Sequence, residues 1–371
     1  MKQFQMHASI SFFDSFRAFA EAMPFGAEDL ILVSGSLYEQ FVLPLSPKCP
    51  VLCSSAFGKG EPTTDQVDRM RSAVPPNIRR IVAVGGGSVL DIAKMLSLRT
   101  SSGKTEDLFL SGETPERVYE VVAVPATCGT GSEVTNACAV ELSGLHTKRG
   151  LSSGLLYPVQ TVLIPELLRG LPYRVFATSS IDALIHAVES FMSPKATPHS
   201  LLFSKEAVRM ILRGYRCLTE KGTGSWTGLA GDFLLAADYA GLAFSSAGCA
   251  AVHALSYPLG GGFHIPHGEA NQLVFAATFR KYREKQPGGR LGDLEALVGE
   301  CLGVSGPDAL EALFLLLDQV LPRKPLRAYG VPADALPSFA QGVLAGQQRL
   351  LANSYVPLTA EDMTAIYEAV Y

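Results

Sequence analysis

The chain has 371 residues, of which 47% are hydrophobic and 18% charged, and its formal net charge is -4 at pH 7. This length allows two domains, and the composition excludes a disordered chain or a coiled coil. The slightly negative charge gives no general attraction to nucleic acid or to an anionic membrane, so neither is predicted as a partner.

The start of the chain, its apolar runs and its cysteines favour a cytoplasmic protein. Residues 1–16 lack the charged, apolar and small-residue regions of a secretory signal. No apolar run reaches the roughly 18 residues that a membrane span needs. The seven cysteines are odd in number and scattered, which favours free thiols in a reducing compartment over a disulfide framework.

The first part of the chain alternates β-rich and helical segments. The runs DLILVSG (29–35), CPVLCSS (49–55), IRRIVAV (78–84) and YEVVAV (119–124) read as buried strands, because they are short and continuously apolar. Helical stretches between such strands are typical of a parallel sheet. The sequence therefore predicts a Rossmann-like α/β domain over residues 1–165.

A first glycine loop lies between a predicted strand and a predicted helix. Gly85, Gly86 and Gly87 follow the apolar strand, and Ser88 with Asp91 has the spacing of a capping box that would open the helix. Glycine lets a ligand approach the backbone, and a helix N-terminus favours a pyrophosphate. The spacing is not G-x-G-x-x-G, so phosphate binding and a tight structural turn both stay open.

A second glycine loop, PATCGTGSEVT (125–135), follows the next strong strand. We expect it to open another helix, with Thr130 and Glu133 as a second capping box. Two such loops in one layer favour an elongated polar ligand such as a dinucleotide. The chain has no G-x-x-x-x-G-K-[ST] segment, which argues against a P-loop nucleotidase.

Residues 166–371 are predicted to form an all-α domain. Beyond Pro165 the β-rich runs end, and Ala- and Leu-rich segments such as IDALIHAVESFM (181–192) and DALEALFLLLDQVL (308–321) follow. Ser179 with Asp182, and Thr359 with Asp362, have the capping-box spacing of helix starts. The predicted fold is thus an α/β domain followed by a helical one.

Asp182 and His186 are four residues apart in a predicted helix, so their side chains share one face. A carboxylate and an imidazole one turn apart can bind a single divalent cation. Two other interpretations stay open at this point. Asp182 can serve only in its capping box, or the two side chains can form an ordinary ion pair.

Three of the seven histidines, His253, His264 and His267, lie within fifteen residues. The segment PLGGGF (258–263) between the first and last of them is predicted to be a glycine turn that brings His253 and His267 together. With Asp182 and His186 they would form a set of one carboxylate and three imidazoles. Such a set suits Fe(II), Zn(II) or a similar ion.

The segments GGGSVLDIAK (85–94), PATCGTGSEVTN (125–136), DALIHAVESF (182–191) and VHALSYPLGGGFHIPHGEAN (252–271) occur in this order. In order and spacing they resemble the iron-containing (group III) alcohol dehydrogenase family over nearly the whole chain. The resemblance implies the two-domain architecture that this family shares with dehydroquinate synthase. It also implies hydride transfer between a nicotinamide cofactor in the interdomain cleft and a small aldehyde or alcohol polarised by a metal ion.

The resemblance assigns roles to individual residues of this chain. The metal ligands implied are Asp182, His186, His253 and His267, with Fe(II) expected and Zn(II) as the alternative. The cofactor contacts implied, for NAD or NADP, are Gly86, Gly87, Ser88, Asp91, Thr127, Cys128, Thr130 and Lys148. Family members are commonly dimers or larger, so a homo-oligomer is expected.

Two positions depart from the family pattern. Gly35 stands where many members carry an aspartate that binds the adenosine ribose and repels a 2'-phosphate, which leaves the preference between NAD and NADP open. Tyr257 replaces a family histidine that relays protons near the nicotinamide. Tyr257 and the neighbouring His264 are therefore the candidate relay residues.

Four further segments resemble the subgroup of the family that interconverts 4-hydroxybutyrate and succinate semialdehyde: HTKRG (146–150), HALSYP (253–258), PRKPL (322–326) and GQQRLLANSY (346–355). The carboxylate of such a substrate calls for a basic side chain. The candidates are Arg149, Arg280, Lys281, Arg327 and Arg349. The alternatives are a reductase of simple alcohols, diols or maleylacetate, a metal-dependent lyase of the dehydroquinate synthase kind, and a dinucleotide-binding protein without catalysis.

Overall fold

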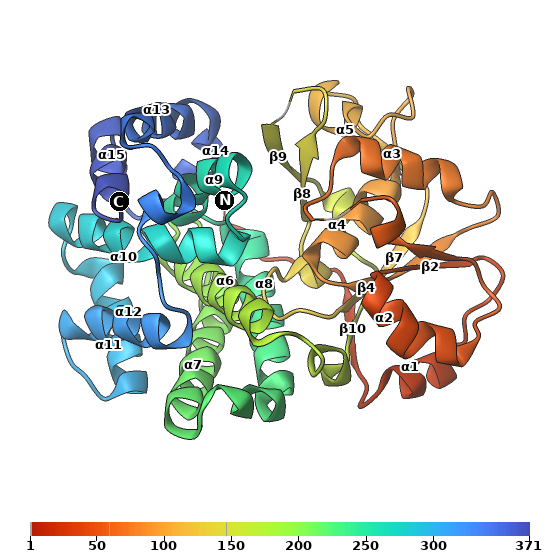
Figure 1. Cartoon of the computed structure of the whole chain (residues 1–371), viewed down its shortest axis with the longest axis horizontal. Helices are drawn as coiled ribbons and strands as arrows, with labels where there is room; N and C mark the ends of the chain where they lie inside the picture. The colour runs from red at the N-terminus through yellow and green to blue at the C-terminus, as the bar shows by residue number, and fades with distance from the viewer. Residues whose placement is uncertain (1, 59, 146) are drawn as a thin grey trace. The chain divides into compact units, whose positions relative to one another are not determined.

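The computed structural model describes residues 2–58, 60–145 and 147–371 (Figure 1). The chain divides into two compact units. One is Met6–Leu171, and the other is Pro172–Tyr371 together with Met1–Gln5. Pro165, where the sequence placed the domain boundary, lies in a short 3-10 helix of the first of these units, Pro165–Leu168. His146, the first residue of the HTKRG segment, lies outside the described residues.

The unit Met6–Leu171 is built on a parallel sheet. In its described residues six strands follow the order β1-β10-β7-β4-β2-β3, and every neighbouring pair is parallel. The strands are β1 (Ser9–Phe12), β2 (Asp29–Val33), β3 (Val51–Cys53), β4 (Arg80–Gly85), β7 (Glu120–Pro125) and β10 (Gln160–Leu163). All five residues of β2 are buried, as are five of the six in β4 and in β7. Three of the four apolar runs therefore form buried strands, as predicted, whereas CPVLCSS forms the edge strand β3, whose residues are only half-buried.

Short helices and two small antiparallel ladders complete this unit. The helices are α1 (Phe16–Ala22), α2 (Gly35–Leu37), α3 (Thr64–Ala73), α4 (Gly87–Leu96) and α5 (Asp107–Leu110). The ladders pair β5 (Leu98–Arg99) with β6 (Glu116–Arg117), and β8 (Ala137–Leu142) with β9 (Thr147–Ser152). The β8–β9 ladder is not among the strands predicted from the sequence.

The unit that begins at Pro172 is helical in its described residues, as predicted. Its helices are α6 (Tyr173–Met192), α7 (Pro198–Lys221), α8 (Ala230–Ala247), α9 (Ala251–Phe263), α10 (His267–Lys285), α11 (Gly289–Leu302), α12 (Asp308–Val320), α13 (Leu336–Gly346), α14 (Gln348–Leu351) and α15 (Ala360–Glu368). Every residue of α6 from 180 to 192 is buried. A helix that is buried on all sides forms the core of its unit. The predicted capping box of Thr359 and Asp362 is confirmed at the start of α15.

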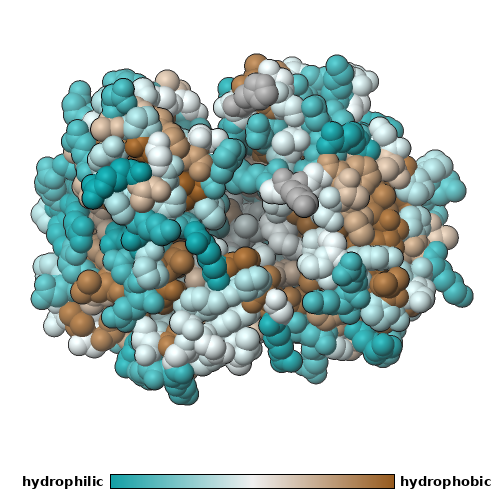
Figure 2. Space-filling view, viewed as in Figure 1, coloured by the Kyte–Doolittle hydropathy of each residue, from teal (hydrophilic) through white to brown (hydrophobic). Residues whose placement is uncertain are grey.

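Figure 2 shows hydrophilic side chains spread over both units, with hydrophobic ones in smaller groups among them. In the described residues no single helix is long and apolar enough to cross a membrane. Thr223–Ala247 and Ala251–Phe263 are long and apolar enough only when taken together, and the chain bends by 107° between them. All seven cysteines are free, as predicted.

Candidate functional site

The two predicted glycine loops lie beside each other. They follow β4 and β7, which are adjacent parallel strands with Gly85 opposite Pro125. A Cβ atom at Gly86 would lie 3.1 Å from the Thr127 methyl group, and one at Gly87 would lie 2.5 Å from the Thr130 methyl group. Glycine is thus required at Gly87 for the loops to pack. The structure brings both loops to the carboxyl edge of the sheet, where ligands of open α/β sheets bind.

The first loop caps α4 through its backbone. Gly86 is the N-cap residue and makes no side-chain capping bond, so the predicted capping box of Ser88 and Asp91 is wrong. Asp91 instead accepts hydrogen bonds from the Ser132 hydroxyl (2.7 Å) and the Ala139 backbone N–H (2.9 Å). Both carboxylate oxygens of Asp91 therefore tie α4 to the second loop and to β8.

The second loop does not open an α-helix. Its last part forms one 3-10 turn, Ser132–Val134, capped by Gly131 in the left-handed conformation, and β8 follows. The predicted capping box of Thr130 and Glu133 is therefore wrong. The chain leaves the turn as an extended strand because the β8–β9 ladder supplies its backbone hydrogen bonds.

The remaining predicted cofactor residues have different surroundings. Cys128 is fully buried in the second loop. Lys148, on β9, forms an ion pair with Glu61 at 2.7 Å. Gly35 begins α2, directly beyond β2, and a Cβ atom there would lie 2.8 Å from the Ser55 hydroxyl oxygen. A larger residue at position 35 would therefore require the Ser55 side chain to move.

Two buried charged side chains belong to these loops and to α4, namely Glu133 in the second loop and Lys94 on the helix. The Lys94 ammonium group donates to the Thr135 hydroxyl (3.1 Å) and the Ala137 carbonyl (2.8 Å). Burial raises the pKa of Glu133 to about 7, although its backbone hydrogen bond and Lys94 oppose the change. One Glu133 carboxyl oxygen, Oε1, is buried without a hydrogen-bond partner. This carboxyl group therefore titrates near neutral pH.

In the helical unit, Asp182 and His186 project from the buried helix α6. The helix begins at Tyr173, so Ser179 lies inside it and donates to the Val175 carbonyl. The predicted capping box of Ser179 and Asp182 is therefore wrong, which removes one alternative role for the carboxylate. The His186 Nδ1 atom lies 3.9 Å from Asp182 Oδ2, with both side chains almost fully buried.

The segment between His253 and His267 differs from the prediction. Residues 258–263 continue the helix α9 to Phe263, so the predicted glycine turn is wrong. The chain reverses at His264, which is in the left-handed conformation, and Pro266 then precedes α10. Glycine patterns alone mislead here because glycine inside a helix costs only about 1 kcal/mol, which packing can outweigh.

Close packing of α10 on α6 places His267 beside Asp182. A Cβ atom at Gly268 would lie 1.9 Å from the Thr178 carbonyl oxygen and 3.2 Å from Asp182 Cβ. No side chain fits there, so Gly268 permits the approach of the two helices. His267 is the first residue of α10, and its Nε2 atom lies 3.7 Å from Asp182 Oδ1.

The four predicted metal ligands come together in the helical unit. The Nε2 atom of His253 lies 3.6 Å from Asp182 Oδ1. Asp182, His253 and His267 each offer a ligand atom within 4.8 Å of the others. The ring of His186 stacks on that of His253, with centroids 4.5 Å apart. Three helices, α6, α9 and α10, thus converge on one carboxylate and three imidazoles.

Glu189, which the sequence analysis did not identify, holds His253 in place. Its buried carboxylate lies 2.6 Å from His253 Nδ1 and accepts from the backbone N–H groups of Ala250 (2.8 Å) and Val252 (2.7 Å). The other ring nitrogen of His253, Nε2, is buried without a hydrogen-bond partner. A carboxylate on one imidazole nitrogen and a ligand position on the other is typical of a metal-binding histidine. The signal in the sequence was an acid in the otherwise apolar stretch AVESFM (187–192).

Electrostatics in this cluster favour a cation. Burial alone raises the pKa of Asp182, but the charges of His186 and His267 outweigh burial and hold it below its usual value. Burial alone lowers the pKa of His253, but Glu189 and Asp182 outweigh burial and raise it to about 9. Asn271 donates to Asp182 Oδ1 at 2.8 Å. The residues present therefore fit a divalent cation, which can replace the positive charge that this cluster stabilises.

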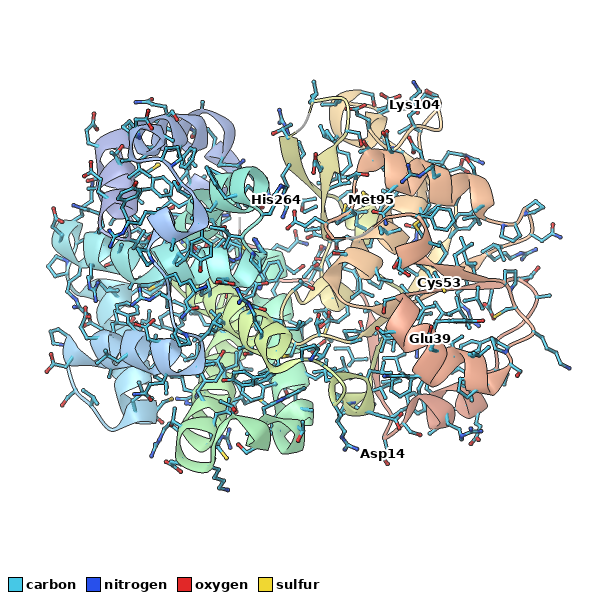
Figure 3. All side chains as sticks on the ribbon, viewed as in Figure 1. Asp14, Glu39, Cys53, Met95, Lys104 and His264 are labelled. Atoms are coloured by element: carbon cyan, nitrogen blue, oxygen red, sulfur yellow. The ribbon has the colours of Figure 1, made fainter. Side chains whose placement is uncertain are left out.

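The two candidate relay residues lie at different places on α9. The ring of Tyr257 has its centroid 6.3 Å from that of His267. His264, labelled in Figure 3, is exposed at the C-terminal end of the helix. The contact with His267 places Tyr257 next to the ligand cluster.

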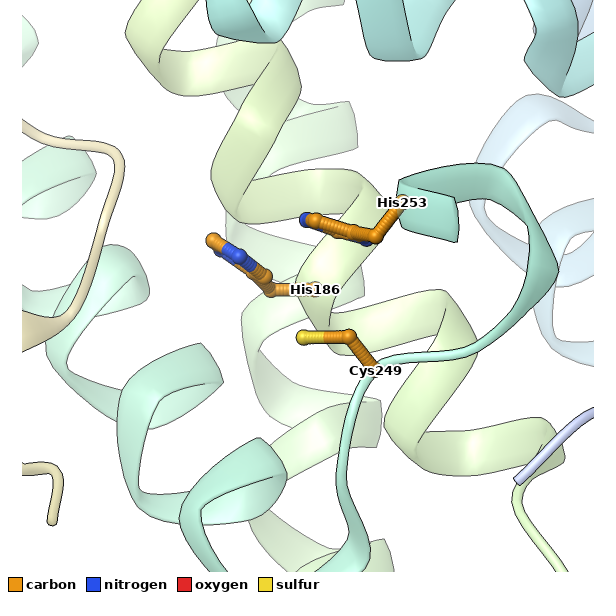
Figure 4. A group of neighbouring side chains, drawn as sticks. All are labelled: His186, Cys249 and His253. Carbon is orange, nitrogen blue, oxygen red and sulfur yellow. The ribbon is translucent and has the colours of Figure 1, made fainter. Parts of the chain in front are cut away.

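A cysteine, also missed by the sequence analysis, joins this cluster. The ligand atoms of His186, Cys249 and His253 all lie within 4.8 Å of one another. Figure 4 shows the three side chains converging, with the sulfur atom next to the two stacked imidazoles.

Family profiles match both parts of the chain. The profile described as iron-containing alcohol dehydrogenase matches residues 20–165. The one described as the C-terminal part of the Fe-containing alcohol dehydrogenase family matches residues 176–371.

Individual relatives agree with these profiles. The chain is 42% identical to 4-hydroxybutyrate dehydrogenase of Clostridium kluyveri, over 100% of both chains. It is 37% identical to long-chain-alcohol dehydrogenase 1 of Geobacillus thermodenitrificans, over 78% of this chain and 74% of that one. A solved structure, sulfoacetaldehyde reductase of Bifidobacterium kashiwanohense in complex with NAD+, shares the fold with a TM-score of 0.84, at 21% identity over 100% of this chain and 98% of that one.

Proposed function

Because the chain belongs to the iron-containing alcohol dehydrogenase family, we propose that it transfers a hydride between a nicotinamide cofactor and succinate semialdehyde or 4-hydroxybutyrate. The observation that carries the chemistry is the convergence of one carboxylate and three imidazoles around the unpartnered Nε2 atom of His253. The full-length similarity to 4-hydroxybutyrate dehydrogenase of Clostridium kluyveri supports the substrate.

In this proposal the metal is held by Asp182, His186, His253 and His267. Fe(II) is expected from the family, and Zn(II) suits the same donors. When bound, the cation supplies Lewis acidity at the carbonyl oxygen, and the reduced nicotinamide supplies the hydride. Glu189 orients the His253 ring, and Asn271 orients the Asp182 carboxylate. Tyr257 is the proposed proton relay, since its ring neighbours that of His267.

The cofactor contacts are proposed for the two glycine loops. Gly86 and Gly87 at the start of α4 would receive the pyrophosphate, because a helix N-terminus offers backbone N–H donors and a favourable dipole. Ser88, Thr127, Cys128 and Thr130 flank that position in the proposal. Asp91 acts through Ser132 and β8 rather than by a free carboxylate, since both its oxygens accept hydrogen bonds. Lys148 would exchange its partner Glu61 for the cofactor.

NAD is the proposed cofactor, and NADP is the alternative. The NAD+ complex of sulfoacetaldehyde reductase, a protein of the same fold, supports the proposal. No carboxylate stands at Gly35 to repel a 2'-phosphate, so the comparison of NADH with NADPH belongs to the first experiment.

Arg349 is the proposed anchor for the substrate carboxylate. Arg280 is already paired with Glu311 and Lys281 with Glu284, both at 2.6 Å, while Arg327 donates to the Tyr371 carbonyl. Arg349 forms no ion pair with any residue of the described ranges, and its side chain is exposed. Arg149, which also lacks an ion pair there, lies on β9 in the other unit.

The backbone of Arg349 is linked to that of Cys249, next to the ligand cluster, by one side chain. Asn353 donates one hydrogen bond to the Cys249 carbonyl (2.9 Å) and another to the Arg349 carbonyl (3.4 Å). This places α14 beside the start of α9, which carries His253. The Arg349 charge also acts on the Cys249 thiol, where it opposes the rise in pKa that burial causes. A guanidinium group at this place suits a carboxylate at the far end of a short aldehyde.

The first experiment measures oxidation of NADH and of NADPH by the purified protein with succinate semialdehyde, butanal, propanal and maleylacetate. Each assay is run before chelation, after chelation and after anaerobic return of Fe(II). We expect activity that is lost on chelation, restored by Fe(II) and highest with succinate semialdehyde. Equal turnover of the plain aldehydes or a preference for maleylacetate contradicts the substrate. No reduction of any aldehyde contradicts the oxidoreductase and favours the lyase.

Substitution of Arg349 tests the anchor. We expect Arg349→Gln to raise the KM for succinate semialdehyde about ten- to a hundredfold, because a charge-assisted hydrogen bond contributes about 1.5 to 3 kcal/mol. The KM for butanal, which lacks a carboxylate, stays unchanged. Arg280→Gln, which removes a guanidinium already paired with Glu311, is the control. An equal rise for both aldehydes contradicts the assignment.

A further inference from the structure

The ligand cluster contains a donor set that includes sulfur. His186, Cys249 and His253 offer two imidazole nitrogens and one thiol sulfur within 4.8 Å of one another (Figure 4). Asp182, His253 and His267 form an oxygen-containing set within the same limit. The two sets share His253, whose Nε2 atom is buried without a hydrogen-bond partner. Nothing in the function proposed above uses Cys249.

Two hydrogen bonds fix the peptide group that joins Cys249 to Ala250. Its carbonyl oxygen accepts from Asn353, and the N–H of the next residue, Ala250, donates to Glu189. Gly248 has φ of +80°, and a Cβ atom there would lie 2.3 Å from the Asn353 amide nitrogen. The segment that carries the sulfur is therefore held rigidly, as a ligand-bearing segment must be.

The chemistry of the two sets differs. Thiolate with imidazole is the donor combination that zinc and cobalt favour, whereas carboxylate with imidazole also suits Fe(II). Glu189 holds the His253 ring by its Nδ1 atom, and the other ring nitrogen, Nε2, has no hydrogen-bond partner. A thiophilic cation bound by His186 and His253 therefore has a thiol sulfur in the same cluster.

We propose that Cys249 is a metal ligand, which together with His186 and His253 binds a thiophilic divalent cation such as Zn(II) or Co(II). The inference rests on the metal site of the proposed function and adds a donor to it. The Cys249 thiol releases its proton to water as the sulfur–metal bond forms, and no oxidant or reductant is needed. Because His253 belongs to both sets, the identity of the bound ion decides whether sulfur is used.

Cobalt absorption spectra test this proposal without an activity assay. The metal-free protein is titrated with Co(II), and the near-ultraviolet and visible spectra are recorded. We expect a thiolate-to-cobalt charge-transfer band in the near ultraviolet and ligand-field bands in the visible. In Cys249→Ser the charge-transfer band is lost while the ligand-field bands remain. Cys217→Ser, which removes a thiol on α7, keeps both features.

Competition between metals gives a second measurement. We expect Cys249→Ser to weaken Zn(II) binding at least about tenfold and to leave Fe(II) binding within about twofold, because loss of a soft donor selects against the thiophilic ion. X-ray absorption at the zinc K-edge of the wild-type protein reports a sulfur neighbour directly. It needs no variant, so a folding defect of Cys249→Ser does not affect it.

The outcomes separate this inference from the proposed function. Ligand-field bands without a charge-transfer band, or a zinc spectrum without sulfur, overturn the role of Cys249 and leave the metal site in place. A charge-transfer band that persists in Cys249→Ser also overturns it. Failure of the wild-type protein to bind Co(II) or Zn(II) at all overturns both.

Discussion

Buried charged groups occur in both units, but their partners differ. In the sheet unit, Lys94 is buried and Asp91 is half-buried next to the glycine loops, and each has two hydrogen-bond partners within the unit. In the helical unit, the His253 Nε2 atom has none. A buried polar atom without a partner costs free energy, so one at the centre of a donor cluster indicates a missing ligand.

The hydrogen-bond partners of a charged side chain indicate whether its role is structural or ligand-binding. Satisfied charges tie segments together, as Asp91 ties α4 to β8. In the helical unit, donor side chains from three helices converge around the His253 Nε2 atom and can bind an ion. Glu133 is an intermediate case, because its buried carboxyl group lacks a partner for Oε1 and its pKa rises to about 7 instead.

The largest expected effect comes from Asp182→Asn, which tests whether the donor cluster of the helical unit needs an ion. Loss of the only carboxylate in the predicted ligand set should remove the bound metal and lower aldehyde reduction by about a thousandfold or more. Metal content by mass spectrometry and steady-state rates measure both. Asp293→Asn, at an exposed position on α11, is the control. Full metal content in Asp182→Asn would contradict the interpretation that Asp182 is a metal ligand.

A smaller effect is expected from Glu189→Gln, which keeps the shape of the side chain and removes its charge. Since a carboxylate on the far nitrogen of a ligating histidine raises its basicity, we expect metal affinity to fall about ten- to a hundredfold. Competition with a chromophoric chelator measures the affinity. A loss of thermal stability without any change in metal affinity would show that Glu189 only supports the fold.

The pH dependence of stability tests the intermediate case, Glu133. Its folded pKa of about 7 lies above the ordinary value of 4.5, so folding favours the protonated form. The stabilisation is complete below pH 4.5 and is lost as the pH rises through 7. Between pH 5 and pH 8, we expect the free energy of unfolding of the wild-type protein to fall by about 2 kcal/mol more than that of Glu133→Gln. Urea unfolding at both pH values measures this difference. Parallel stability profiles of wild type and variant would contradict the assignment.

The smallest effect is expected from Gly87→Ala, which tests whether the packing of the two glycine loops positions the cofactor. The added methyl group meets Thr130 at 2.5 Å and pushes the two loops apart. We expect the KM for NADH to rise about tenfold, the equivalent of 1.4 kcal/mol, with metal content unchanged. Gly154→Ala, in the same unit and with open space around it, is the control. An unchanged KM would place the cofactor away from this loop.

Much of the architecture was predictable because it follows from local patterns. Continuous apolar runs predicted β2, β3, β4 and β7, and helical periodicity predicted the second unit. The predictions that were wrong also came from local patterns. Three capping boxes and one glycine turn have the right spacing in the sequence, but tertiary packing gives those segments other hydrogen-bond partners.

The sequence by itself determined which residues are candidates: the two glycine loops, the carboxylate and histidine of one helical turn, and the pair His253 and His267. Only the tertiary structure decided that Glu189 and Cys249 belong with them. Glu189 reaches His253 from 64 residues away, and Cys249, four residues before His253, lies ahead of the first turn of α9 and so shares no helical face with it. The physical reason is that a metal site is defined by distances among side chains on α6, α9 and α10, and these distances exist only once Gly268 lets the helices pack.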